Sequence, residues 1–400
     1  MKIMYRWVIL FLFTVSQIVL SMGEFGWGPL APFLKEALSL TEAHIGIISS
    51  VLFFSNAISA FLAGISVDRY GVRKNFLLWL GITGVPMFLL VFFHQSYLIL
   101  VVLVTISGLG YGMGNPVAVK GLYTWFDPRM RATAVGVRQA AVPLGGAITG
   151  ILTVYVAQKL SWFMVPGIMG ALSILMLGIA FFVYKEPPLV SPSTVKKEKG
   201  DLRGGFRELF SNRKLLSMFI IMALFGLGQG TITTFLTLYL YESLNYGLLM
   251  AGSLFSLTMI GGGVGRILWG IISDRLFKRR EPVLLIMAVL ATMTVAATAL
   301  WSTNWPVWLF SVPAFLLGFL GIGWNALALV FIAELSGASR AGTAVGLSSA
   351  ISWLGLAVGA PVFGYIVTFS SYVYSWFFIA GIYFIATLLC ISMTFLTRQR

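Results

Sequence analysis

The chain has few of the residues on which catalytic and disulfide-bonded proteins depend. Only 10% of its 400 residues are charged, and it contains one cysteine and two histidines. The single cysteine, Cys390, excludes an intramolecular disulfide and a multi-cysteine metal cluster. No phosphate-binding loop and no metal-ligand spacing occurs in the sequence. The sequence therefore predicts neither an enzyme nor a metal or cofactor site.

Apolar residues dominate the sequence. Hydrophobic residues make up 58% of the chain, and apolar stretches near 20 residues long recur along its whole length. Each is long enough to cross ~30 Å of hydrocarbon. The twelve predicted spans are 7–33, 45–67, 76–94, 97–124, 132–157, 162–184, 215–240, 246–273, 282–301, 305–333, 341–368 and 372–396. The predicted fold class is an all-α polytopic membrane protein with twelve transmembrane helices.

The N-terminus also resembles a secretion signal, because Lys2 and Arg6 precede an apolar run. No small-residue cleavage site follows, and the apolar sequence continues past Trp27. We therefore interpret this segment as the first span.

The net charge of +14 is explained by topology rather than by a nucleic-acid partner. With both ends inside, all but four of the 27 lysine and arginine residues lie on one side of the membrane. Lys35 and Lys159 fall on the other side, and Arg138 and Arg266 fall within spans. The protein is predicted to lie in the cell membrane. By the positive-inside rule, both of its termini are predicted to be cytoplasmic. The basic loops also attract anionic lipid headgroups.

The sequence contains an internal repeat. The charged string at 64–74 recurs at 270–280, an offset of 206 residues, and Gly108 through Asn115 parallels Gly318 through Asn325 at an offset of 210. The polar stretch 185–214 separates the two copies. These features predict two pseudo-symmetric six-helix bundles, 1–184 and 215–400, joined by a cytoplasmic linker.

Two copies of one loop motif carry a resemblance to a known family. The first copy has Gly64, Asp68, Arg69, Gly71 and Arg73 in the pattern G-x-x-x-D-R-x-G-x-R, between the second and third spans. With two six-helix halves and a central loop, the chain resembles the Major Facilitator Superfamily over essentially its whole length. The resemblance implies secondary transport of a solute by alternating access, by a protein that is usually a monomer.

The second copy retains Gly270, Asp274 and Arg275, but Phe277 replaces the second glycine. By resemblance, Gly64 and Gly270 permit close helix approach, and the two aspartates lock the cytoplasmic gate. Arg131 and Arg340, at the entrances of the fifth and eleventh spans, are the expected partners of those aspartates.

Three ionisable residues lie inside spans, where they are costly and therefore informative. They are Glu24, Arg138 and Arg266. At the repeat offsets, Arg138 corresponds to Ser348 and Arg266 to Ala60, so neither arginine has a charged twin. Two guanidinium groups at one central site favour an anion, because each can bind a carboxylate or phosphate bidentately.

Structural roles are the alternatives. Arg266 can pair with a neighbouring carbonyl or carboxylate, and Arg138 can extend toward the cytoplasmic end. Glu24 can carry protons or contact solute, form an ion pair with an arginine, or face a solvated vestibule. Further candidates for the site are polar or amphipathic residues at mid-membrane depth, namely Tyr111, Asn115, Gln139, Gln229, Trp324 and Asn325.

The predicted function is uptake of a small, monocarboxylate-like organic anion coupled to proton entry. One alternative is proton-coupled export of lipophilic or cationic compounds, with Glu24 facing a cationic solute. Drug antiporters of the family carry an arginine early in the fourth span, whereas this chain is apolar around Val104. They also carry Gly-Pro-x-x-Gly-Gly in the fifth span, where this chain has the shorter Val142-Pro143-Leu144-Gly145-Gly146. A second alternative, outside transport, is a sensor or scaffold that moves nothing.

Overall fold

The computed structural model describes residues 2–186, 210–277, 279–302, 305–337 and 341–398. Within these ranges the chain is helical and has no strand. The first helices are α1 (Lys2–Phe25), α2 (Trp27–Leu38), α3 (Glu42–Tyr70), α4 (Val72–Leu89), α5 (Tyr97–Tyr111), α6 (Gly114–Trp125), α7 (Pro128–Lys159) and α8 (Met164–Val183). They are followed by α10 (Arg213–Glu242), α11 (Leu248–Ile272), the π-helix η1 (Ser273–Phe277), α12 (Arg280–Thr298), α13 (Val307–Gly321), α14 (Asn325–Ser336), α15 (Ala341–Phe369) and α16 (Tyr372–Arg398).

Eleven helical stretches of the described residues are long and apolar enough to cross a membrane. The remaining predicted span, 76–94, overlaps α4, whose first turn carries Arg73 and Lys74 and is therefore less apolar. The prediction of an all-α polytopic membrane protein is confirmed.

Three of the spans are interrupted in the middle, and proline explains two of the interruptions. A proline removes one backbone donor, and its ring clashes with the carbonyl four residues earlier. Pro29 stands four residues after Phe25, where α1 ends, and Pro116 stands four residues after Gly112, which separates α5 from α6. The first span is therefore α1 with α2, the fourth is α5 with α6, and the tenth is α13 with α14.

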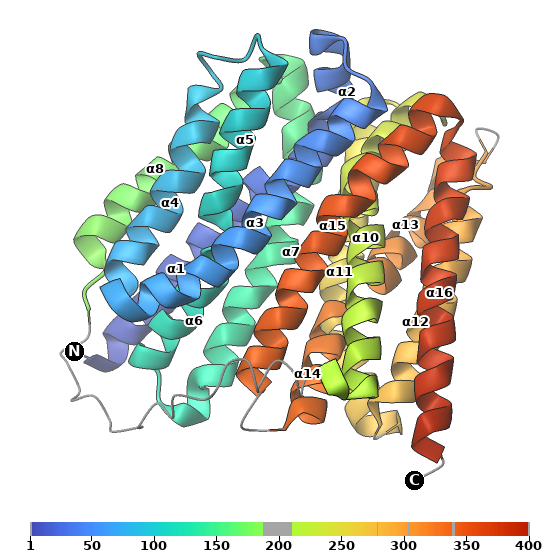
Figure 1. Cartoon of the computed structure of the whole chain (residues 1–400). Helices are drawn as coiled ribbons and strands as arrows, with labels where there is room; N and C mark the ends of the chain where they lie inside the picture. The colour runs from blue at the N-terminus through green and yellow to red at the C-terminus, as the bar shows by residue number, and fades with distance from the viewer. Residues whose placement is uncertain (1, 187–209, 278, 303–304, 338–340, 399–400) are drawn as a thin grey trace.

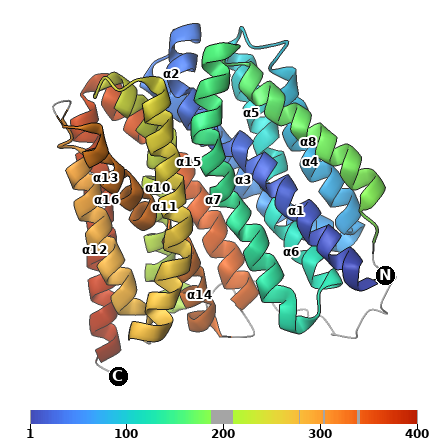
Figure 2. The same ribbon diagram turned by 180° about the vertical axis from the view of Figure 1, so that it is seen from behind.

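Helices α1 to α8 lie on one side of the molecule and α10 to α16 on the other (Figures 1 and 2). We call them the first and second helix sets. The two ends of the chain lie on the same face, which we call the terminal side; the opposite face is the distal side. The division of the chain into 1–184 and 215–400 stays a prediction, and most of the predicted linker lies outside the described residues.

The two helix sets meet through α3 against α15, α7 against α11 and α2 against α10. Glycines permit this approach on the distal side. A Cβ atom at Gly28 would lie 2.0 Å from the carbonyl oxygen of Thr233, and one at Gly46 would lie 2.7 Å from that of Ala360. Small residues of this kind let helix backbones approach closely in a membrane.

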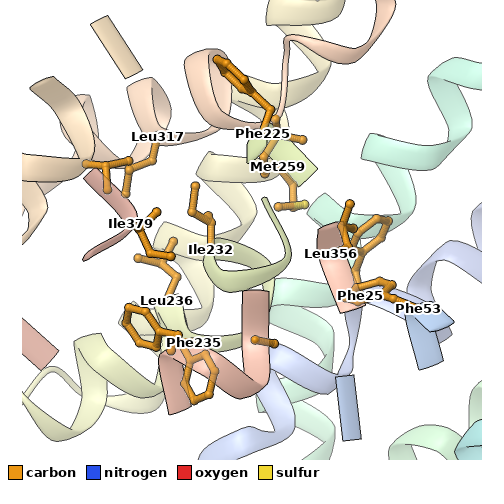
Figure 3. Close-up of a cluster of buried hydrophobic side chains, with 14 of the residues drawn as sticks. Phe25, Phe53, Phe225, Ile232, Phe235, Leu236, Met259, Leu317, Leu356 and Ile379 are labelled. Carbon is orange, nitrogen blue, oxygen red and sulfur yellow. The ribbon is translucent and has the colours of Figure 1, made fainter. Parts of the chain in front are cut away.

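Large apolar side chains fill the remaining space between the sets. Phe25 and Phe53 from the first set belong to the same buried cluster as Met259 and Leu356 from the second. Figure 3 shows Phe25 and Phe53 beside Leu356. The distal part of the interface is therefore a packed core.

An ion triad of Lys35, Glu42 and Glu242 closes the distal end of this core. The Lys35 ammonium lies 2.5 Å from Glu42 of its own set and 2.6 Å from Glu242 of the other. The Tyr372 hydroxyl donates to Glu242 at 2.8 Å. One lysine thus holds carboxylates from both helix sets.

The terminal side differs. Open space surrounds the positions at which a Cβ atom would be added to Gly64, Gly136, Gly270 and Gly346, with no atom within 4 Å. The close approach predicted at Gly64 and Gly270 is not made in this conformation, because the sets touch distally and diverge toward the terminal side (Figure 1). That role stays a prediction for a conformation closed on the terminal side.

We expect Gly28→Ala to destabilise this conformation by about 1–3 kcal/mol, because the added methyl group overlaps the Thr233 carbonyl. The measurement is the thermal unfolding midpoint of purified protein in detergent. Gly178→Ala is the matched control, since no atom lies within 4 Å of its Cβ position. An equal or higher midpoint in Gly28→Ala would contradict the observed packing.

We expect Lys35→Gln to open the distal interface, because Glu42 and Glu242 lose the cation that they share. Ser49→Cys supplies the reporter, since the Ser49 side chain is buried and accepts a hydrogen bond from Thr234 of the other set at 2.9 Å. Maleimide labelling of this cysteine should become about tenfold faster. A tenfold change corresponds to a shift of about 1.4 kcal/mol in the equilibrium between the closed and the open interface. Lys159→Gln removes the other distal lysine and should leave the rate unchanged.

Candidate functional site

Polar side chains gather at mid-height on one face of α1. Gln17, Ser21 and Glu24 follow one another at helical spacing, and at most 3% of each is exposed. Together with residues of five other helices they form what we call the central polar cluster. Its members are Gln17, Ser21, Glu24, Asn56, Tyr111, Asn115, Arg138, Gln139 and, from the second helix set, Arg266.

Arg138 on α7 organises the cluster. It is 1% exposed, and its guanidinium carbon Cζ lies over the Trp79 ring, 5.8 Å from the ring centroid. Nη1 donates to Asn115 Oδ1 and, at 3.1 Å, to Gln139 Oε1; Nη2 donates to Gln17 Oε1. Arg138 forms no salt bridge with a carboxylate of the described residues. Its positive charge is therefore held by neutral oxygens alone.

The amide of Gln17 extends this network to α5. Its Nε2 donates to Ser21 Oγ at 2.7 Å and to the Tyr111 hydroxyl at 3.0 Å. Both hydrogens of the amide are thus used within the first helix set. Gln17 links the guanidinium of Arg138 to Tyr111.

Glu24 is 3% exposed, and only one of its oxygens is satisfied. Oε1 accepts a hydrogen bond from Asn56 Nδ2 at 2.7 Å, whereas Glu24 Oε2 and Asn56 Oδ1 are buried without a partner among the described residues. The central polar cluster therefore contains one carboxyl oxygen without a hydrogen bond from the described residues.

Arg266 on α11 comes from the second helix set and forms no salt bridge with Glu24, since none of its nitrogens lies within 4.0 Å of the carboxylate. It interacts electrostatically with Glu24 and Tyr111, and its Nε is buried without a described partner. One turn nearer the distal side, a Cβ atom at Gly263 would lie 3.3 Å from Pro143 of α7. Arg138 and Arg266 both lie just on the terminal side of this contact. A close approach of the two arginines to each other stays a prediction.

The second helix set contributes three further predicted residues. Gln229 is 6% exposed and its Oε1 is buried without a described partner. Trp324 is 1% exposed and packs against Phe225, with ring centroids 5.5 Å apart. Asn325, at the start of α14, is half-buried. Contact of these residues with a solute stays a prediction.

Four residues were missed from the sequence, namely Gln17, Ser21, Asn56 and Trp353. Gln17 precedes Glu24 by seven residues, so helical spacing placed both on one face and could have revealed it. Trp353 of α15 packs across the interface, 5.9 Å from the Phe53 ring and 6.4 Å from the Tyr111 ring. An aromatic residue in an apolar span gives no sequence signal that distinguishes such a contact from lipid exposure.

In this conformation each gate aspartate pairs with another cation of the described residues, and its pairing with Arg131 or Arg340 stays a prediction. Asp68 pairs with Lys120 at 2.6 Å, and Asp274 pairs with Arg280, which also binds Glu334 at 2.9 Å. Arg131 instead donates to the Phe126 carbonyl at 3.1 Å. Arg340 lies outside the described residues.

The remaining gate residues explain the imperfect second motif. Gly71 has a positive φ of 83° and ends α3, and the backbone N–H of Arg73 donates to Glu186. Phe277 needs no such conformation, because the chain continues there as the π-helix η1. Arg69 stacks on the neighbouring Tyr70 ring at 5.3 Å.

No three His, Cys, Asp or Glu side chains in the described part of the chain are grouped to hold a metal ion.

A family model describes most of this chain. The model of the Major Facilitator Superfamily matches residues 13–347. The chain belongs to the Major Facilitator Superfamily. It is therefore a multi-pass membrane transporter of a solute, as the repeated motif predicted.

Relatives within the family carry several substrates. The chain is 27% identical to a probable sulfoacetate transporter of Cupriavidus necator, over 84% of this chain and 81% of the relative. It is 27% identical to a probable hexose phosphate transport protein of Chlamydia muridarum, over 83% and 78%. The chain is also 33% identical to a hexuronate transporter of Bacillus subtilis, over 39% of this chain and 36% of the length of that relative.

Solved structures share the fold at low identity. A bacterial homologue of the human lysosomal transporter Spinster, inward-facing and occupied, has a TM-score of 0.80 at 14% identity, covering 98% of this chain and 97% of its own. The nucleoside transporter NupG has a TM-score of 0.78 at 15% identity, covering 96% and 99%. The fold class is thus that of the superfamily.

Proposed function

We propose that the protein imports a small organic anion together with protons. The observation that carries this proposal is the charge of Arg138, which is buried at mid-membrane and held only by amide oxygens. A buried cation without a counter-charge is costly, and a bound anion reduces that cost. The named substrates of the three relatives, sulfoacetate, hexuronate and hexose phosphate, are anions, which supports the proposal.

In this proposal Arg266 is the direct anion ligand. It is half-buried, belongs to the second helix set, and has a guanidinium nitrogen without a described partner. An anion between Arg266 and the first helix set contacts both sets at once. Such a ligand site between the repeats is where alternating access requires it.

Glu24 is the proposed proton carrier, and its place beside Arg266 gives a coupling mechanism. When Glu24 is ionised, it attracts Arg266. When a proton binds the free oxygen Oε2, Glu24 becomes neutral and Arg266 is available to the anion. Proton and anion therefore bind together, which is the requirement for symport.

The direction follows from the predicted topology. If the basic loops and both termini face the cytoplasm, the helix sets of the conformation described above pack together on the outer side and diverge toward the inner side. Inward movement of protons then drives import of the anion. One alternative is export of a cationic compound, in which Glu24 would be the recognition charge. The other alternative is a scaffold that transports nothing.

We expect Arg266→Gln to abolish saturable uptake of the transported anion into proteoliposomes, or to raise its KM at least tenfold, because the direct counter-charge is lost. The radiolabelled probes are sulfoacetate, glucuronate and glucose 6-phosphate. Arg213→Gln, which removes an exposed arginine at the start of α10, should transport normally. Unchanged uptake in Arg266→Gln would refute the anion site, and saturable uptake confined to lipophilic cations would favour export.

We expect Glu24→Gln to lose the acceleration of uptake by an imposed proton gradient, while retaining exchange of labelled for unlabelled anion. Glutamine keeps the size of the side chain but carries no transferable proton. The measurement compares uptake at equal and unequal pH across the vesicle membrane. Glu36→Gln, on an exposed position of α2, is the control. Full dependence on the gradient in Glu24→Gln would exclude Glu24 as the carrier.

A further inference from the structure

We propose that Asn115 and Gln139 bind the charged group of the transported anion, and that Arg138 positions both amides without touching the solute. We call the two side chains the amide pair. The inference rests on the proposed function, since it names the subsite that such an anion occupies. It assigns Arg138 a different role from that of Arg266.

The chemistry of the guanidinium group fixes which way the amides face. Arginine has five N–H donors and no acceptor, so an amide that bonds to it must present its oxygen. Nη1 of Arg138 donates to the oxygens of both Asn115 and Gln139. Each NH2 group is therefore turned away from Arg138.

The two NH2 groups are free to bind a ligand. Asn115 is exposed and Gln139 is half-buried, and neither NH2 group has a partner among the described residues. An exposed asparagine at mid-membrane depth is costly against lipid, so we place it toward the space between the helix sets. The amide of Gln17 differs, because Ser21 and Tyr111 accept both of its hydrogens. Gln17 anchors Arg138, and the amide pair faces the solute.

The resulting subsite offers only donors. Asn115 also stands in the first turn of α6, where the positive end of the helix dipole adds to the charge of Arg138. A carboxylate, sulfonate or phosphate group presents only acceptors and fits this arrangement. A cation or an ammonium group does not.

Asn115→Asp tests the subsite with an isosteric change. The aspartate still accepts a hydrogen bond from Arg138, but the atom that faces the solute changes from a donor to an acceptor. Gln139→Glu makes the same change at the second amide. Asn245→Asp, in an exposed loop, and Gln158→Glu, at the exposed distal end of α7, are the matched controls.

The measurement is a thermal-shift titration of the purified protein with sulfoacetate, glucuronate and glucose 6-phosphate. The dissociation constant of the probe that binds should rise at least tenfold in Asn115→Asp and in Gln139→Glu, and stay unchanged in both controls. If the probe binds wild type and Asn115→Asp equally, the amide pair is not the subsite, although the anion transporter stands. If no probe binds wild type, the proposed function fails and this inference with it.

Arg138→Lys separates positioning from charge. Lysine keeps the positive charge but lacks the planar fork that holds several amides at once. We expect the dissociation constant to rise about tenfold in Arg138→Lys. In a protein that already carries Asn115→Ala and Gln139→Ala, adding Arg138→Lys should not raise the dissociation constant further. Binding by Arg138→Lys as tight as that of wild type would show that only the charge matters, and would overturn the positioning role.

Discussion

A guanidinium group buried at the centre of a membrane constrains much of this molecule. Transfer of a charged side chain into hydrocarbon is opposed by several kcal/mol unless polar groups surround it. For Arg138 those groups come from α1, α6 and α7, so three helices must keep their registers for the charge to be solvated. The packing of the first helix set is thereby tied to the geometry of its polar site.

This constraint also orders the neighbouring groups. Gln17 is committed to Arg138 at its oxygen and to Ser21 and Tyr111 at its nitrogen. Glu24, two turns further along α1, interacts with Asn56, with Tyr111 and with Arg266 of the second helix set. A polar chain that starts with a fixed cation thus ends at a carboxyl group that faces the other helix set.

Much of this architecture could be predicted from the sequence, because its strongest patterns are long ones. Apolar runs near 20 residues and the repeated loop motif predicted the fold class and the family. The free-energy cost of placing an ionisable side chain inside the membrane singled out Glu24, Arg138 and Arg266. Partners were harder to predict. The position of Lys120 beside Asp68 depends on how α3 and α6 pack, which no local pattern encodes. Trp353 looks like any aromatic residue of an apolar span, and its contact with Tyr111 exists only in the folded interface.

The ion triad at the distal end has an electrical consequence. Glu42 and Lys35 belong to the first helix set and compensate each other, whereas Glu242 belongs to the second. When the sets part on this side, a neutral pair separates from a lone carboxylate. The newly opened mouth then carries a net negative charge on one wall only. An anion, the class of solute proposed above, is repelled by that carboxylate and is therefore directed toward the wall formed by the first helix set, which bears Arg138.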